Sequence, residues 1–142
     1  MHTSIDEYTL IERMPTAAEY SALRSSVRWS VLDPIMTQEA LDSSIYGCCL
    51  LDKDRVIGTG RIVGDYQFYV YLQDIIIDPE FQHQGCGRQI MNHLLSYLAQ
   101  NAPSGAFIGM FSGHNIDSIM AKYSFVRDSF QHMSKGLFFV KK

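Results

Sequence analysis

The sequence predicts a mixed α/β domain in which helices cover the faces of one central sheet, and three observations support this prediction. Short segments rich in β-branched and aromatic residues lie between turn residues, which is typical of strands. Apolar residues recur at helical spacing, most clearly from Gly87 to about Gln100. The two kinds of segment follow one another in the order β-α-α-β-β-β-α-β-α-β-β. We therefore expect an α/β (α+β) fold with a mixed, mostly antiparallel sheet of about six to seven strands and about four helices.

The first third of the chain contains one expected strand and two expected helices. Residues 8–14 form a strand-like run that a proline stops. A Thr-Ala-Ala-Glu capping box over residues 16–19 precedes an apolar stripe, so a helix begins there. Pro34 interrupts the chain, and residues 37–41 suggest a second, short helix.

The middle of the chain predicts a three-stranded meander and a long helix. Residues 45–51 and 56–63 flank an Asp-Lys-Asp turn and form a hairpin. A Gly-Asp turn then leads into a third strand over residues 68–77. The amphipathic helix at residues 87–100 follows.

The last third of the chain completes the sheet. Residues 106–111 predict a buried strand, and residues 115–123 predict a short helix. Two final runs, residues 125–130 and 136–140, can form a hairpin.

Length and composition predict one globular domain over residues 1–142, with 46% hydrophobic and 19% charged residues. A net charge of −3 argues against nucleic acid as a partner, because non-specific binding needs a basic surface. No apolar run is long enough to span a bilayer, so no membrane partner is expected. The N-terminus lacks a signal sequence, and the three cysteines lack a zinc spacing. We therefore expect reduced thiols, no metal site and a cytoplasmic location.

The most informative segment is the Ile-rich run of residues 74–79, which is followed by Gln-His-Gln-Gly-Cys-Gly-Arg at residues 82–88. A strand, a loop and a helix N-terminus follow one another here, and their free N–H groups and helix dipole suit an anion. The loop lacks both the lysine of a P-loop and the GxGxxG spacing of a dinucleotide fold. Glycines that serve only the turn, and an unrelated phosphate- or nucleotide-binding module, are the alternatives.

Residues 82–87 have the form [RQ]xxGx[GA] after a strand that ends in Asp-Pro, and this pattern resembles motif A of the GNAT acyl-CoA N-acyltransferase superfamily. The resemblance covers most of the chain and is strongest from Gly58 to Leu98. Residues 71–79 look closest to the bacterial and plastid arylalkylamine (serotonin-type) group. The resemblance implies a GNAT fold and an acetyl-CoA-dependent N-acetyltransferase. Its acceptor would be a primary amine of a small molecule, a peptide N-terminus or a lysine, attacking directly in a ternary complex.

The resemblance also implies which residues bind coenzyme A. Backbone N–H groups from Gln84 to Arg88 would bind its pyrophosphate without a metal, and the glycines would allow a close approach. The pantetheine arm would pair with the exposed edge of the preceding strand, as an added strand does. The predicted coenzyme-binding residues are Ile75, Ile76, Ile77, Gln82, His83, Gln84, Gly85, Cys86, Gly87, Arg88 and Asn115.

For catalysis, Asp74 is the predicted general base, with a structural ion pair as the competing interpretation. A backbone N–H near Ile76 or Ile77 is the implied oxyanion donor. Many members of the superfamily use a tyrosine to protonate the leaving thiolate. Met120 stands at that position here, and Tyr123 is the predicted substitute, with packing against the sheet as the competing interpretation. A thiolate whose thiol has a pKa of about 8.5 can also leave unassisted. The alternative function is a GNAT-fold acyl-CoA-binding or regulatory protein with little turnover.

Aromatic side chains predict the acceptor site. Trp29, Tyr69 and Tyr71 are the predicted substrate-binding residues, which would stack on an apolar amine or hold an ammonium group by cation–π contact. Packing in the core is the alternative for Trp29. The expected partner is a small-molecule amine substrate. Because homodimers are common in the superfamily, the resemblance also suggests a homodimer.

Overall fold

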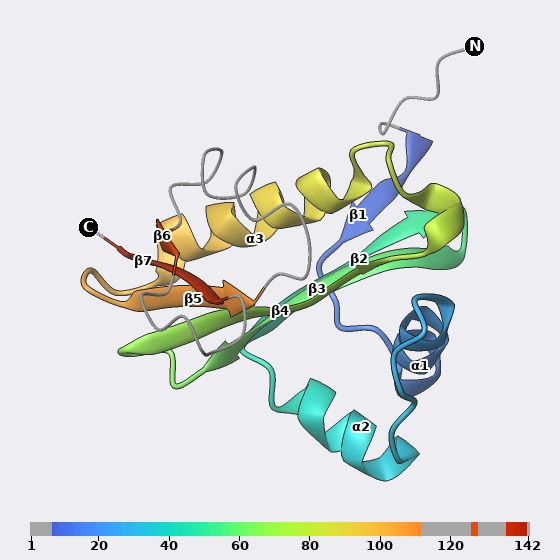
Figure 1. Cartoon of the computed structure of the whole chain (residues 1–142), viewed down its shortest axis with the longest axis horizontal. Coiled ribbons are helices and arrows are strands. Elements are labelled where there is room, and N and C mark those ends of the chain that lie inside the picture. The colour runs from blue at the N-terminus through green and yellow to red at the C-terminus, as the bar shows by residue number, and fades with distance from the viewer. Residues whose placement is uncertain (1–6, 112–125, 128–135, 142) are drawn as a thin grey trace.

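The computed structural model describes residues 7–111, 126–127 and 136–141, and its strands form one seven-stranded sheet in the order β1-β2-β3-β4-β5-β7-β6 (Figure 1). The strands are β1 (Thr9–Ile11), β2 (Tyr46–Asp52), β3 (Arg55–Gly64), β4 (Tyr69–Ile77), β5 (Phe107–Phe111), β6 (Val126–Arg127) and β7 (Gly136–Val140). The helices are α1 (Ala17–Ser26), α2 (Pro34–Asp42), α3 (Cys86–Asn101) and the 3₁₀ turn η2 (Pro79–Phe81). Neighbouring strands are antiparallel, except that β4 and β5 are parallel.

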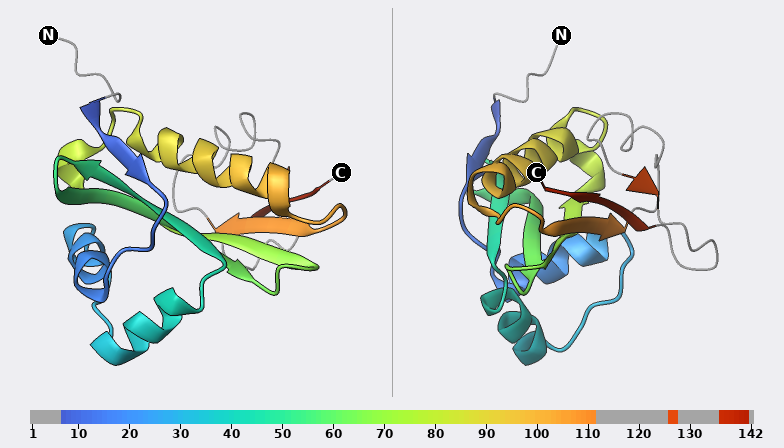
Figure 2. Two further views of the ribbon diagram at one scale, coloured as in Figure 1. Left: turned by 180° about the vertical axis from the view of Figure 1, so that it is seen from behind. Right: turned by 90° about the vertical axis from the view of Figure 1, so that its left-hand side faces the viewer.

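This architecture confirms the predicted fold class. Helix α3 covers one face of the sheet, and α1 and α2 lie on the opposite face (Figures 1 and 2). Helix α2 begins earlier than the predicted residues 37–41, because Pro34 starts this helix rather than interrupting the chain. A proline is well suited to the first helical turn, and the Asp33 carboxylate caps that turn by accepting from Met36 N at 3.0 Å. The predicted helix at residues 115–123 lies outside the described residues.

The main core lies between α3 and the sheet. Ile90 and Leu94 of α3 are fully buried against β3, where glycines leave room for the helix. A Cβ on Gly60 would lie 2.7 Å from Ile90 Cγ2 and 2.9 Å from Leu94 Cδ1. Larger residues on this strand would push α3 away, so the close approach fixes the position of the helix relative to β3 and β4.

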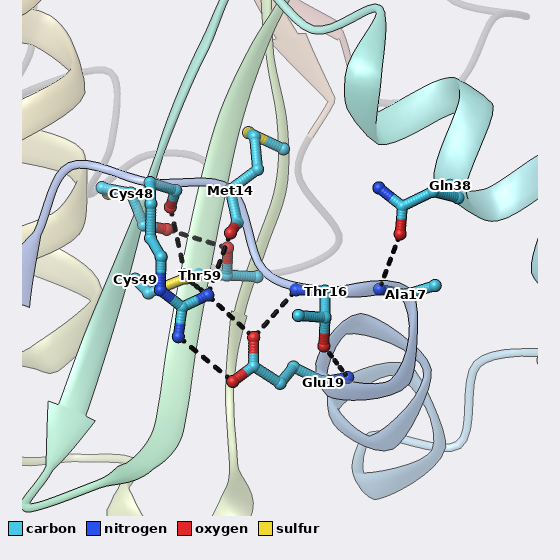
Figure 3. A network of polar contacts seen from close by, with 9 residues as sticks. Met14, Thr16, Ala17, Glu19, Gln38, Cys48, Cys49 and Thr59 are labelled. Carbon is cyan, nitrogen blue, oxygen red and sulfur yellow. Dashed lines mark hydrogen bonds and ion pairs between the residues drawn. The ribbon is translucent and has the colours of Figure 1, made fainter.

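A polar network attaches the start of α1 to the opposite face of the sheet (Figure 3). Thr16 and Glu19 form the predicted capping box, with Glu19 N donating to Thr16 Oγ1 at 3.1 Å and Thr16 N donating to Glu19 Oε1 at 2.8 Å. Arg13 also donates to Glu19 Oε1 at 2.8 Å, and the Arg13 carbonyl accepts from the Cys49 thiol of β2 at 3.3 Å. These contacts join the cap of α1 to the sheet.

The cysteines Cys48, Cys49 and Cys86 are unpaired and buried. In the ranges that the structure describes, no helix is long and apolar enough to cross a membrane. The same ranges hold no group of three or more His, Cys, Asp or Glu placed to bind a metal ion.

Candidate functional site

The first feature of the candidate site is an open edge of β4. Strands β4 and β5 pair only from Tyr69 to Leu72, opposite Phe107 to Met110. From Gln73 to Ile77, β4 has no β5 partner within the described part of the chain. The two parallel strands therefore separate near the middle of β4, and main-chain groups of β4 become available on that side.

The hydrogen bond of the next residue shows which main-chain groups face this open edge. Asp78 N donates to Ile57 O of β3 at 2.9 Å. Since the N–H and C=O groups of alternate residues point to opposite edges of a strand, we infer that the main-chain groups of Ile77, and by the same alternation those of Ile75, face away from β3 and toward the open edge. Ile76, by contrast, faces its partner Thr59 on β3. This alternation favours Ile75 and Ile77 over Ile76 as main-chain partners of the coenzyme, and all three contacts stay predictions.

A β-bulge lies at the point where the two strands separate. Thr59 pairs with Ile76 and Arg61 with Gln73, so β4 has one residue more than β3 in this interval. Asp74, inside the bulge, has a φ of +55°, which is a left-handed conformation. A bulge bends its strand and redirects a side chain. Here it directs the Asp74 carboxylate toward α1.

The loop after β4 is fastened at both ends. Gln82 Nε2 donates to Ile77 O at 2.9 Å, and Gln84 Oε1 accepts from the Tyr8 hydroxyl at 3.0 Å. Asp78 caps η2 by accepting from Glu80 N at 3.0 Å, which is a common role of aspartate at a turn. The side chains of both glutamines therefore hold the loop in place, and the sequence had assigned them to the coenzyme.

The loop ends at the N-terminus of α3. Gly85 is the N-cap, and its φ of +90° is readily accessible only to glycine. The first intrahelical bond runs from Gln89 N to Gly85 O at 3.0 Å. The preceding N–H groups, those of Cys86, Gly87 and Arg88, donate to no other residue within the described ranges. Three consecutive donors at a helix N-terminus are suited to an anion, and anion binding here stays a prediction.

The side chains of this loop differ in what they offer a ligand. A Cβ on Gly87 would meet only Ile77 Cγ1, at 3.8 Å, so packing does not require glycine there. The Cys86 side chain is 1% exposed, and burial raises the pKa of its thiol, so only its backbone is available. His83, with a φ of +65°, and Arg88 are exposed.

Asp74 lies in a cluster of charged and aromatic side chains on the α1 face. Arg61 Nε donates to Asp74 Oδ2 at 2.7 Å, and the Tyr20 hydroxyl donates to the same oxygen at 2.8 Å. Arg24 NH1 lies 3.8 Å from Asp74 Oδ1. The side chain of Asp74 is 11% exposed. We call Tyr20, Arg24, Arg61 and Asp74 the Asp74 cluster. The general-base role of Asp74 stays a prediction, and the competing ion pair is present.

The three predicted substrate-binding residues lie in two places. Trp29 is 43% exposed, and the Arg24 guanidinium carbon lies 5.4 Å from the centre of its ring, next to the Asp74 cluster. Its predicted alternative, packing in the core, is therefore wrong. Tyr69 and Tyr71 lie at the start of β4, with ring centres 6.0 Å and 6.1 Å from that of Phe107.

Tyr123 and Asn115, predicted as proton donor and coenzyme ligand, lie outside the described residues, as does Met120. Sequence reasoning also missed three partners of Asp74. Tyr20 lies in the apolar stripe predicted for α1, which gave no sign of a polar role. Arg24 and Arg61 belong to no motif. A charged residue between apolar neighbours, as Arg61 is, was the only available signal.

Comparisons with known proteins show which proteins this chain is similar to. A family model described as "Acetyltransferase (GNAT) family" matches residues 11–123. "Uncharacterized N-acetyltransferase ycf52" of Porphyra purpurea is 29% identical over 114 residues, which are 78% of this chain and 64% of that protein. "GCN5-related N-acetyltransferase 2, chloroplastic" of Arabidopsis thaliana is 26% identical over 132 residues, which are 92% of this chain and 50% of that protein. This chain thus spans between half and two thirds of the length of these relatives.

A solved structure supports the fold independently. The chain superimposes with a TM-score of 0.81 and 24% identity on a Staphylococcus aureus protein described as a probable acetyltransferase. The match covers 95% of this chain and 99% of the other. At this identity the likeness shows a shared fold.

Proposed function

The chain belongs to the GNAT acetyltransferase family, and on this premise we propose that it transfers the acetyl group of acetyl-CoA to a primary amine. One arrangement carries the proposal: the open edge of β4 leads through a fastened loop into the free N–H groups of α3. Coenzyme A joins an extended arm with two amides to a pyrophosphate, so one ligand can use both sets of main-chain groups.

The residues of the site fit this coenzyme. We propose that the N–H groups from Cys86 to Arg88 bind pyrophosphate oxygens and that the exposed Arg88 guanidinium adds a charge-assisted bond. The pantetheine amides would pair with the carbonyl of Ile75 and with the main chain of Ile77. The open space beside Gly87 supports this proposal, because a side chain there would occupy the volume in front of the donors.

The proposed reaction is direct attack on the thioester. The amine lone pair forms a C–N bond to the carbonyl carbon while the carbonyl oxygen becomes an oxyanion. A main-chain N–H of Ile75 or Ile77 would stabilise that oxyanion. The C–S bond then breaks, the thiolate leaves and takes up a proton, and the nitrogen loses a proton. A thiolate whose thiol has a pKa of about 8.5 leaves without assistance, so the reaction does not depend on Tyr123.

The destination of the amine proton has two candidates. The sequence predicts Asp74, and a proton passing to its carboxylate would compete with the bonds from Arg61 and Tyr20. Release of the proton to water is the other route. The substitutions Asp74→Asn and Asp74→Ala distinguish these two routes, because neither side chain can take up the proton.

For the acceptor, we propose a small primary amine with an apolar or aromatic body. The half-exposed ring of Trp29 beside the Asp74 cluster supports this class, as does the predicted similarity to the arylalkylamine group. A peptide N-terminus or a lysine side chain is the competing class. Since the chain spans only part of its relatives' length, the cytoplasmic location and the homodimer also stay predictions.

The methionine at position 120 favours a second candidate function, an acyl-CoA-binding regulator with little turnover. Methionine cannot donate a proton, whereas the family resemblance implies a tyrosine at that position in many members of the superfamily. Both candidates need the same coenzyme site, so only turnover distinguishes them.

The experiment combines calorimetric titration with a turnover assay. Acetyl-CoA, coenzyme A and ATP are titrated into the protein, and thiol release is then followed over arylalkylamines, polyamines and peptides. Binding of acetyl-CoA with amine-dependent thiol release supports the proposed enzyme. Binding without release above the hydrolysis background supports the regulator. Binding of ATP without coenzyme A would refute both and favour a nucleotide module.

A further inference from the structure

The bulge in β4 has a backbone conformation that needs support from its surroundings. Asp74 has a φ of +55° in the middle of a strand. A residue with a Cβ adopts this conformation at a cost in free energy, and it persists only where neighbouring groups hold it. The structure therefore has to supply contacts that favour the bulged form over a regular strand.

The Asp74 cluster supplies these contacts from two separate elements. Arg61 of β3 and Tyr20 of α1 both donate to Asp74 Oδ2, at 2.7 Å and 2.8 Å. Arg24 of α1 lies 3.8 Å from the other oxygen. The side chains of Asp74 and both arginines are only 11% to 16% exposed, so these contacts are largely shielded from water.

The arginines are themselves held by main-chain and hydroxyl groups. Arg61 NH1 donates to Ser44 Oγ at 2.9 Å and to Ala40 O at 3.3 Å, at the end of α2. Arg24 Nε donates to Ser30 O at 2.7 Å, in the connection between α1 and α2. The bulge is thus attached to α1, to the end of α2 and to β3 at once.

We propose that Arg61 and Tyr20 are positioning residues for acetyl transfer. They hold Asp74 in its left-handed conformation, and this fixes the direction of the adjacent Ile75 N–H at the open edge of β4. That N–H would bind the carbonyl oxygen of the acetyl group. The inference rests on the proposed function and deepens it, since it names the residues that orient the oxyanion donor.

In this account the carboxylate of Asp74 acts through hydrogen bonds and its backbone conformation, not through proton uptake. Asparagine keeps an oxygen that can accept from Arg61 and Tyr20, and it tolerates the left-handed region better than most residues. Alanine keeps neither property. A general base predicts a different result, because asparagine and alanine are equally unable to take a proton.

The first test compares affinities, which do not depend on turnover. Dissociation constants for acetyl-CoA and coenzyme A are measured by calorimetry for wild type, Tyr20→Phe and Arg61→Met. The acetyl group is the only part of acetyl-CoA that the Ile75 N–H would contact. We expect the variants to lose about threefold or more of the preference for acetyl-CoA, while their affinity for coenzyme A changes less than about twofold.

The second test uses kcat and the two substitutions of Asp74. We expect Arg61→Met to lower kcat by about tenfold or more, as loss of an oriented oxyanion donor does. Asp74→Asn should retain at least about tenfold more kcat than Asp74→Ala, with the same pH profile as wild type. Arg13→Met is the control, because it removes a guanidinium with a similarly short carboxylate contact, to Glu19 at 2.8 Å, outside the bulge.

The outcomes separate this inference from the function on which it rests. Equal loss of kcat in Asp74→Asn and Asp74→Ala would overturn it in favour of a base, and unchanged ligand preference and kcat in Tyr20→Phe and Arg61→Met would overturn it in favour of simple packing. The unfolding temperature of each variant is measured, and each assay is run below it, so that only folded protein is compared. If wild type binds neither acetyl-CoA nor coenzyme A, the proposed function fails and this inference falls with it.

Discussion

Gln82 Nε2 donates a 2.9 Å hydrogen bond to the carbonyl oxygen of Ile77, the last residue of β4. This bond joins the start of the loop to the end of the open strand edge. Together with the Tyr8–Gln84 bond at the other end of the loop, it helps to hold the two halves of the candidate coenzyme site, the strand edge and the N-terminus of α3, in a defined relation.

Substitution of Gln82 tests this relation. Gln82→Leu removes the donor to Ile77, so the loop should lose about 1 kcal/mol of stabilisation and coenzyme A should bind several-fold more weakly. Calorimetry with coenzyme A and thermal unfolding measure the two effects. Gln100→Leu, on the exposed last turn of α3, is the matched control and should change neither. If Gln82→Leu binds coenzyme A with unchanged affinity, the bond from Gln82 to Ile77 does not contribute to binding.

Gly87→Ala should stabilise the protein and weaken coenzyme binding at the same time. The Cβ would meet only Ile77 Cγ1 at 3.8 Å, and alanine is favoured over glycine in a helix by about 0.5–1 kcal/mol. The same methyl group would stand before the N–H donors of the helix. Thermal unfolding should show a higher unfolding temperature, and titration with coenzyme A should show a lower affinity.

Ser96→Ala provides the control for the helix effect, because Ser96 is exposed in the interior of α3, away from its N-terminus. It should stabilise the helix slightly and leave binding unchanged. If Gly87→Ala binds coenzyme A as wild type does, the proposed location of the pyrophosphate is wrong. Gly85 is less suitable for this test, because its φ of +90° strains any side chain.

Arg88→Ala should weaken coenzyme A binding in a salt-dependent manner. An exposed guanidinium beside a phosphate contributes a charge-assisted bond, and exposed charges are screened by salt. We expect about a tenfold loss at low ionic strength and a smaller loss at about 0.5 M salt. Lys53→Ala, in the exposed turn between β2 and β3, removes a like charge and should have no such effect. An equal loss at all salt concentrations would contradict the phosphate contact.

The Arg13–Glu19 pair predicts how stability depends on pH. The hydrogen bond from Arg13 lowers the pKa of Glu19 from 4.5 to about 2. The folded state therefore binds this proton more weakly than the unfolded chain does, so the stabilisation is complete above pH 4.5 and is lost as pH falls toward 2. The exposed position of Arg13 limits the effect to about 1 kcal/mol.

Glu19→Gln should thus lower the unfolding temperature at neutral pH, and the difference from wild type should shrink below pH 4.5. Glutamine can still complete the capping box, so the substitution isolates the charge. Glu39→Gln, at an exposed position of α2, is the control. A difference that persists unchanged to pH 2 would show that the charge of Glu19 is not responsible.

Several features of the fold were predictable because they depend on neighbours in the sequence. The capping box at Thr16 and Glu19, the turn at Asp78 and the apolar stripe of α3 each act within a few residues. Pro34 was misjudged although its signal is also local. A proline can end a helix or begin one, and the Asp33 cap decides between these.

By itself, the sequence determined the strand, loop and helix N-terminus that form the anion site, since glycine conformations, caps and periodicity are local properties. Only the tertiary structure decided that β4 separates from β5, that Ile75 and Ile77 rather than Ile76 face the opening, and that Asp74 is held by Arg61 and Tyr20. Tyr20 and Asp74 are 54 residues apart in the chain. Such contacts depend on strand register and on the bulge, which no local pattern of residues specifies.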